Sequence, residues 1–143
     1  MNNLSSRITE FYMSVAEKAA ELSRARRLKV GAVIVKDNNL ISFSWNGTPA
    51  GWDNNCEDEL SDGTLRTKPE VVHAEMNAIL KISRSHESSA GADLYVTHST
   101  CSECAKSVIQ AGIKRVFYKH DFRDTTGLDI LRKGGIEVIK LED

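Results

Sequence analysis

The chain has 143 residues, which is enough for one domain with a substantial core and too few for two. Its 19 basic and 20 acidic residues give a formal net charge of -1, which argues against a polynucleotide substrate because no overall positive field attracts nucleic acid. The sequence has no apolar run of about 18 residues that would span a membrane, and it begins without the basic and apolar segments of a secretory signal, so we expect a cytoplasmic protein.

The first half of the chain predicts a helix, a hairpin and a long loop. Residues 5–23 carry apolar side chains three and four apart, which is typical of an amphipathic helix. The β-branched segment 30–36 and the segment 40–45, joined by turn residues at 37–39, indicate two antiparallel strands. The polar stretch 46–68 has no sustained period, and a loop of this length usually carries function. We expect the inward stripe of the helix to be Ile8, Phe11, Tyr12, Val15, Ala19 and Leu22.

The second half alternates helices and strands. The expected helices are 73–85, with Met76, Ile79, Leu80 and Ile82 inward, 102–111 and 126–133, and the expected strands are 92–98, 114–119 and 136–141. Helical crossovers make neighbouring strands parallel, and the helices must cover the faces of the sheet. The sequence therefore predicts an α/β fold, a three-layer α/β/α sandwich around a five-stranded mixed sheet. Its first two strands form an antiparallel hairpin, and its last strand runs parallel to the fourth.

Two predicted helix starts carry side chains that suit a metal ion. Three cysteines make a poor disulfide framework, because the number is odd and the cytoplasm is reducing. Cys101 and Cys104 lie on one side of a first helical turn, where the free N–H groups favour thiolates. His73, at another helix start, completes a His/Cys/Cys set that leaves one zinc position open for water. Glu75, two residues later, is placed to carry protons in the deamination of a cytosine at C4 by zinc-bound hydroxide.

Each of these residues alone has a plainer interpretation. A Cys-x-x-Cys pair in a cytosolic protein can be a redox or structural element, and His73 can be an ordinary helix-start or core histidine. Glu75 alone is a first-turn carboxylate that the helix dipole favours. Cys56, if it were a fourth ligand, would make the zinc structural rather than catalytic. Together, at two helix starts that follow apolar segments, the four residues favour the catalytic metal site.

Four segments of the chain resemble the cytidine/deoxycytidylate deaminase family, and most closely its deoxycytidylate (dCMP) deaminases. They are VGAVIVKDNNLISFSWNGTPAGWDNNCE, VVHAEMNAIL, LYVTHSTCSECAKSVIQAGIKRVFY and GLDILRKGGIEVI. The His-Ala-Glu and Cys-x-x-Cys motifs are general to the superfamily, whereas NGTPAG combined with HAEMNAIL points to dCMP rather than free cytidine. The family usually has proline before the first cysteine. Thr100 stands there in this chain and is expected to act as the N-cap of the following helix.

The resemblance implies a single deaminase domain over 1–143 with the cytidine deaminase-like fold and one Zn²⁺ per chain. The implied reaction is hydrolytic deamination of dCMP to dUMP and ammonia, with His73, Cys101 and Cys104 as ligands and Glu75 as the proton shuttle. It further implies a homo-oligomer, a hexamer or a dimer, with dCTP and dTTP as possible effectors and no polynucleotide or membrane partner.

The resemblance also suggests which residues contact the nucleotide. A basic cluster, Arg24, Arg26, Arg27 and Lys29, follows the first helix and could supply a contact to a 5′-phosphate, although cations are favoured at a helix end in any case. Asn46 would hydrogen-bond the sugar, although Asn46-Gly47 also reads as a turn. Tyr118 would stack on the base or serve as a packing residue. The expected substrate-binding residues are Asn46, Thr48, Ala74, Ser99, Thr100, Arg26 and Tyr118.

Other functions remain open at the level of sequence. A deaminase of the same fold could act on tRNA adenosine or on a riboflavin precursor, although the tRNA enzyme would be expected to have a basic surface. A zinc-stabilised binding module would have no need of Glu75. A thiol oxidoreductase would have no need of His73 or Glu75, and zinc analysis would distinguish it.

Overall fold

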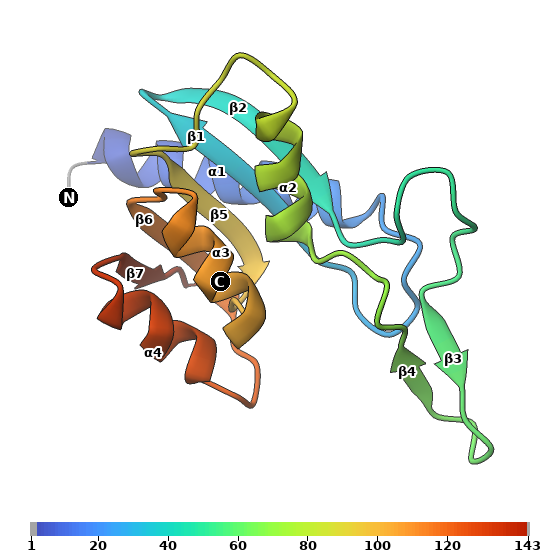
Figure 1. Ribbon diagram of the computed structural model, residues 1–143. Helices are drawn as coiled ribbons and strands as arrows, with labels where there is room; N and C mark the ends of the chain where they lie inside the picture. The colour runs from blue at the N-terminus through green and yellow to red at the C-terminus, as the bar shows by residue number, and fades with distance from the viewer. Residues whose placement is uncertain (1–2, 143) are drawn as a thin grey trace.

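The computed structural model describes residues 3–142, which form a five-stranded sheet between two layers of helices. The helices are α1 (Asn3–Ala20), α2 (Ala74–Ser83), α3 (Ser102–Gln110) and α4 (Thr126–Lys133). The strands of the sheet are β1 (Gly31–Lys36), β2 (Asn39–Trp45), β5 (Asp93–His98), β6 (Arg115–His120) and β7 (Glu137–Lys140). A separate two-stranded hairpin consists of β3 (Glu57–Glu59) and β4 (Leu65–Thr67) and projects away from the sheet (Figure 1).

The spatial order of the sheet is β2-β1-β5-β6-β7. β1 pairs antiparallel with both β2 and β5, whereas β5, β6 and β7 are parallel to one another. Asp37 and Asn38 both have positive φ angles, 51° and 58°, which is the left-handed pair that a tight two-residue hairpin turn requires. The predicted first hairpin, the mixed sheet and the parallel last strand are confirmed.

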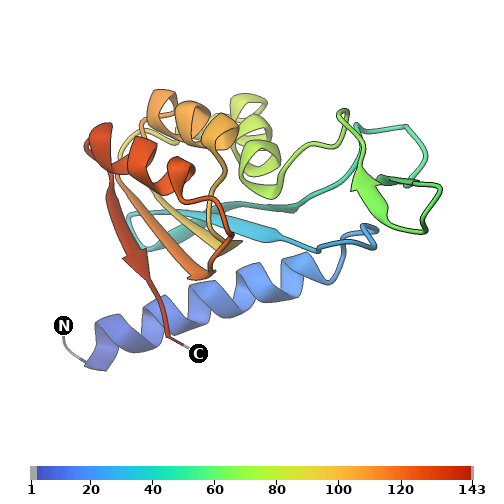
Figure 2. The same cartoon turned by 90° about the horizontal axis from the view of Figure 1, so that it is seen from below.

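The helices cover the two faces of the sheet unequally. α1 lies alone across one face, and α2, α3 and α4 lie side by side on the other (Figure 2). The side chains of β1 point alternately to the two faces of the sheet and contribute to both cores. Ala32 and Ile34 face the three-helix side, while Val33 and Val35 pack against α1. The predicted three-layer α/β/α architecture is therefore confirmed.

The buried faces of two helices differ in part from the prediction. On α1, Tyr12 and Ala19 are buried as predicted, but Phe11 is 59% exposed, and Leu22, which follows the end of the helix, is 55% exposed. Ala16, outside the predicted stripe, is fully buried. Gly31 explains the demand for small residues, since a Cβ on it would lie 1.9 Å from the Ala16 carbonyl oxygen. On α2, Leu80 is exposed, and the contact with the sheet is made chiefly by the alanines at 74 and 78 and by Ile82.

The stretch 46–68 was predicted as a loop and in fact contains β3 and β4. An isolated bridge between Gly47 and Val72 then ties the start of this stretch to the approach of α2. Among the described residues, none of the helices is long and apolar enough to cross a membrane.

Candidate metal centre and active site

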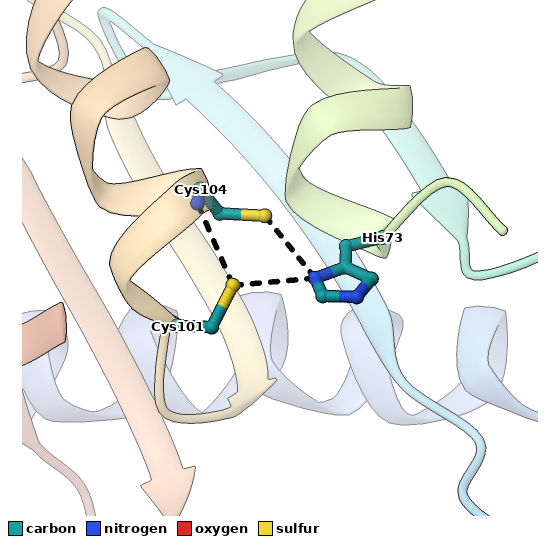
Figure 3. Close-up of side chains that lie close together, drawn as sticks. All are labelled: His73, Cys101 and Cys104. Atoms are coloured by element: carbon teal, nitrogen blue, oxygen red, sulfur yellow. Dashed lines mark hydrogen bonds between the residues drawn. The ribbon is translucent and has the colours of Figure 1, made fainter. Parts of the chain in front are cut away.

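The three predicted metal ligands meet between the first turns of α2 and α3 (Figure 3). Nδ1 of His73 lies 3.4 Å from Sγ of Cys101 and 3.3 Å from Sγ of Cys104, and the ligand atoms all lie within 4.8 Å of one another. Tetrahedral zinc with ordinary Zn–N and Zn–S bonds separates such a nitrogen and sulfur by about 3.6 Å. The arrangement therefore fits one zinc ion held by three protein ligands.

The cysteines owe their placement to a helix start. Cys101 itself is the N-cap of α3, with extended φ and ψ angles of -76° and 167°, and its sulfur accepts a hydrogen bond from the Cys104 backbone N–H. Thr100 was expected in that capping role, and this expectation is wrong, because its side chain is buried one residue before the cap. His73 occupies the matching N-cap position of α2.

The pKa values of the two cysteine thiols are shifted in opposite directions. The pKa of Cys101 is lowered to about 3, chiefly by the hydrogen bond from the Cys104 thiol and further by His73. The same hydrogen bond is the main cause of the raised pKa of Cys104. His73 has a raised pKa chiefly because of its hydrogen bond with Cys101. A cation bound here would favour the thiolate form of both cysteines, and its binding would release protons.

Glu75 lies within the first turn of α2, and only 4% of its surface is exposed. Burial raises the pKa of Glu75 from its usual 4.5 to about 7, although its own backbone N–H and the nearby His73 partly oppose the shift. A carboxyl group whose pKa lies near neutrality both takes up and releases protons at the pH of the cell. This property suits a proton carrier beside the metal ligands.

A cavity of about 330 Å³ opens in front of the cluster, a volume typical of small-molecule sites. It lies between the metal ligands and the segments that lead into β1 and out of β6. Its lining residues are Arg27, Leu28, Val30, Asn46, Thr67, Val71, His73, Ala74, Glu75, His98, Cys101, Ser102, Phe122 and Asp124.

Of the residues predicted to bind substrate, Asn46 and Ala74 line this cavity. Asn46 is already engaged at both ends of its amide, because it accepts from Val30 N–H and donates to the Leu28 carbonyl, both at 2.9 Å. Its evident role is to hold the chain that enters β1, and the cavity-facing amide could still meet a sugar hydroxyl.

The remaining predicted contacts are not among the lining residues. Tyr118 is 5% exposed and lies in the core against the three-helix layer, so a stacking role on the base is not supported. Ser99 and Thr100 are buried, and the Ser99 hydroxyl accepts a hydrogen bond from Phe122 N–H. Thr48 donates its hydroxyl to the Asp53 carbonyl within its own loop.

The basic cluster does reach the cavity, but through a different arginine. Arg26 is directed to Glu57 and Asn55, whereas its neighbour Arg27 lines the cavity. Successive side chains of an irregular segment point in different directions, so Arg27 rather than Arg26 is placed to contact a ligand in the cavity.

Sequence analysis missed an aromatic wall of the cavity. The His98 ring lies 5.0 Å from that of His120 and stacks at 5.8 Å on Phe122. Burial, followed by the influence of His120, lowers the pKa of His98, so this ring is neutral near pH 7. A signal was available, since His98 ends a predicted strand immediately before the metal motif, at the sheet edge where ligands commonly bind.

A His/Cys/Cys metal site and a buried glutamate at the N-termini of two neighbouring helices define the protein as a zinc-dependent hydrolytic deaminase. Comparison with known proteins agrees, since residues 6–120 match the model of the cytidine and deoxycytidylate deaminase zinc-binding region. The chain belongs to this family.

Individual relatives cover nearly the whole chain. ComE operon protein 2 of Bacillus subtilis is 38% identical over 138 residues, covering 93% of this chain and 70% of that protein. The deoxycytidylate deaminase of Enterobacteria phage T4 is 33% identical over 168 residues, covering 90% and 87%. The crystal structure of dCMP deaminase from cyanophage S-TIM5, in complex with dCMP and dUMP, superimposes with a TM-score of 0.88 at 44% identity and 99% coverage of both chains.

Proposed function

We propose that the chain is a zinc-dependent dCMP deaminase that converts dCMP and water to dUMP and ammonia. The observation that carries the proposal is the convergence of His73, Cys101 and Cys104 beside the buried Glu75 at the floor of one cavity. The deoxycytidylate deaminases among the relatives support the choice of base and phosphate.

The residues have separate tasks in this reaction. His73, Cys101 and Cys104 would hold the zinc, which when bound acts as a Lewis acid and makes water a nucleophile toward C4. Glu75 would take one proton from the attacking water and deliver it to N3 of the ring, and would then carry the second proton of the same oxygen to the amine, which leaves C4 as ammonia. Burial of Glu75, which raises its pKa to about 7, favours a group that both accepts and releases protons.

We assign recognition of the sugar and the phosphate to the end of the cavity away from the metal ligands. Arg27 is the basic residue of the cluster that lines it, and we infer that its guanidinium binds the 5′-phosphate. Asn46 is retained as the contact to the sugar. Two charged hydrogen bonds, at roughly 1.5–3 kcal/mol each, would favour dCMP over deoxycytidine by on the order of 10²-fold or more in kcat/KM, allowing for solvent exposure.

Four further expectations belong to this proposal. They are the action of 1–143 as a single deaminase domain, the cytoplasmic location, the homo-oligomeric state and the response to dCTP and dTTP.

An ammonia-release assay across dCMP, CMP, deoxycytidine, cytosine and dCTP tests the proposal. We expect dCMP to be turned over far better than deoxycytidine, and Arg27→Ala to remove most of that preference. Arg24→Ala, which removes the same charge from an exposed position near the same segment, is the matched control and should keep the preference. Equal kcat/KM for dCMP and deoxycytidine in the wild-type protein would show that the phosphate is not recognised.

A further inference from the structure

The segment that carries Arg27 has no secondary structure of its own. Residues 24–30 connect α1 to β1 without a helix or strand, so their shape depends on groups elsewhere in the chain. One such group acts at the end next to β1, where the Asn46 amide binds Val30 N–H and the Leu28 carbonyl. Arg27 lies immediately before this clamp.

A second clamp acts on the other side of Arg27. Oε2 of Glu57 accepts hydrogen bonds from the backbone N–H groups of both Arg26 and Arg27, each at 3.0 Å. Oε1 of the same carboxylate lies 3.4 Å from Nε of Arg26, at ion-pair distance. Only 1% of the Glu57 side chain is exposed, and a buried carboxylate is tolerated when several donors converge on it as they do here.

Glu57 comes from the projecting hairpin, which also forms part of the cavity wall. It pairs across the hairpin with Thr67, and Thr67 lines the cavity. The hairpin is closed at its base by a hydrogen bond from Lys68 N–H to the Cys56 carbonyl. The β3–β4 hairpin thus supplies both part of the cavity wall and the carboxylate that accepts hydrogen bonds from the backbone of residues 26 and 27.

We propose that Glu57 is a positioning residue for substrate recognition, which fixes the backbone at 26–27 so that the guanidinium of Arg27 faces the phosphate end of the cavity. The proposal rests on the proposed function, because it takes Arg27 as the phosphate contact. Glu57 is not among the residues that line the cavity, so it acts through Arg27. The ion pair with the Arg26 side chain orients the carboxylate, and the two backbone hydrogen bonds transmit its position.

The test compares Glu57→Gln with Glu59→Gln, the same chemical change at an exposed position of the same strand. Glutamine keeps the shape and one acceptor oxygen but loses the charge, and its amide NH₂ would face the Arg26 guanidinium. We expect Glu57→Gln to lower the kcat/KM ratio of dCMP to deoxycytidine by roughly tenfold, mainly through a higher KM for dCMP. Glu59→Gln should keep the wild-type ratio, and both variants should keep full zinc content.

The double variant Arg27→Ala/Glu57→Gln separates positioning from a general structural effect. If Glu57 acts through Arg27, the double variant has the same ratio as Arg27→Ala alone. A Glu57→Gln protein with an unchanged ratio, or with equal losses on both substrates, overturns the proposal. Should Glu57→Gln fail to fold, Glu57→Asp keeps the charge at shorter reach and must still lower the ratio.

Hydrogen exchange distinguishes failure of this inference from failure of the proposed function. The amides of 26 and 27 should be protected in the wild-type protein and should exchange faster in Glu57→Gln, whatever the substrate is. If these amides respond but Arg27→Ala keeps the dCMP preference, the phosphate contact of the proposed function fails, and the recognition role of Glu57 fails with it. If Arg27→Ala removes the preference and Glu57→Gln changes neither the exchange nor the ratio, only the inference about Glu57 is overturned.

Discussion

Gly127, in the first turn of α4, packs directly against the peptide that leads into the cysteine helix. A Cβ built on Gly127 would lie 1.9 Å from the Thr100 carbonyl oxygen and 2.7 Å from the carbonyl carbon of Cys101. Both atoms belong to the backbone, so no side-chain rotation can relieve the overlap. In Gly127→Ala, either α4 must move away from the sheet or the start of α3 must shift, and the start of α3 holds both thiol ligands.

The size of the effect follows from two opposing contributions. Alanine is preferred over glycine within a helix by up to about 1 kcal/mol, so helix propensity alone predicts that Gly127→Ala is stabilising. Forcing a methyl group into packed backbone costs typically ~1–3 kcal/mol, and an overlap of this depth lies toward the upper end. The expected net loss is about 1–2 kcal/mol of unfolding free energy. For a chain of 143 residues, this corresponds to a fall in Tm of roughly 3–6 °C.

Thermal unfolding and zinc analysis of three alanine variants test this reasoning. Gly47→Ala is the matched control, because its Cβ would have nothing within 4 Å, and its Tm and zinc content should match the wild type. A Cβ on Gly134 would have the Ile109 side chain, and no backbone atom, as its nearest neighbour, with Cδ1 at 2.5 Å; this side chain can rotate, so the loss in Gly134→Ala should be intermediate. Gly127→Ala should lose the most stability and bind zinc more weakly. A Gly127→Ala protein as stable as the wild type, with full zinc content, would refute the argument.

Three further predictions concern the chemistry and the assembly. Glu75→Gln should keep the fold and the zinc while turnover falls by at least ~10²-fold, with Glu103→Gln, exposed on α3, as the control that keeps activity; retained activity would mean that another group moves the protons. Cys101→Ser and Cys104→Ser should each lower zinc content and activity together, and full zinc content in both would exclude these ligands. Light scattering at micromolar concentration should show a homo-oligomer, a dimer or a hexamer, and a monomer alone would contradict this expectation.

The parts of the fold that sequence analysis predicted are those with a strong local signal. The turn at Asp37-Asn38 is one, since few residues other than asparagine, aspartate and glycine accept positive φ so readily. The β3–β4 hairpin was not predicted, because its strands are three residues long and largely polar and therefore show no measurable alternation of hydrophobicity. The buried face of α1 was predicted in part, since Tyr12 and Ala19 are buried, but hydrophobicity alone favoured the exposed Phe11 over Ala16, which lies at the close approach to Gly31.

In the candidate site, too, the residues that could be predicted are those with a strong local signal in the sequence. His73, Glu75 and Cys101 could be predicted because they lie at helix starts, where short spacings in sequence are short distances in space. Arg27 and Glu57 could not be paired, because they are 30 residues apart in the sequence, with β1, β2 and a loop between them, and only the folded chain brings them together.

The two halves of the cavity are therefore held by different means. The metal ligands and Glu75 sit at the N-termini of helices packed on the sheet, where many contacts resist displacement. Residues 26–30, which include Arg27, are held by the polar side chains of Asn46 and Glu57, so a single substitution can move them without disturbing the sheet. If Arg27 binds the phosphate as proposed, changes in the projecting hairpin should alter which cytosine compound is accepted before they alter the chemistry at C4. Substrate range can then diverge among proteins that keep the same metal centre.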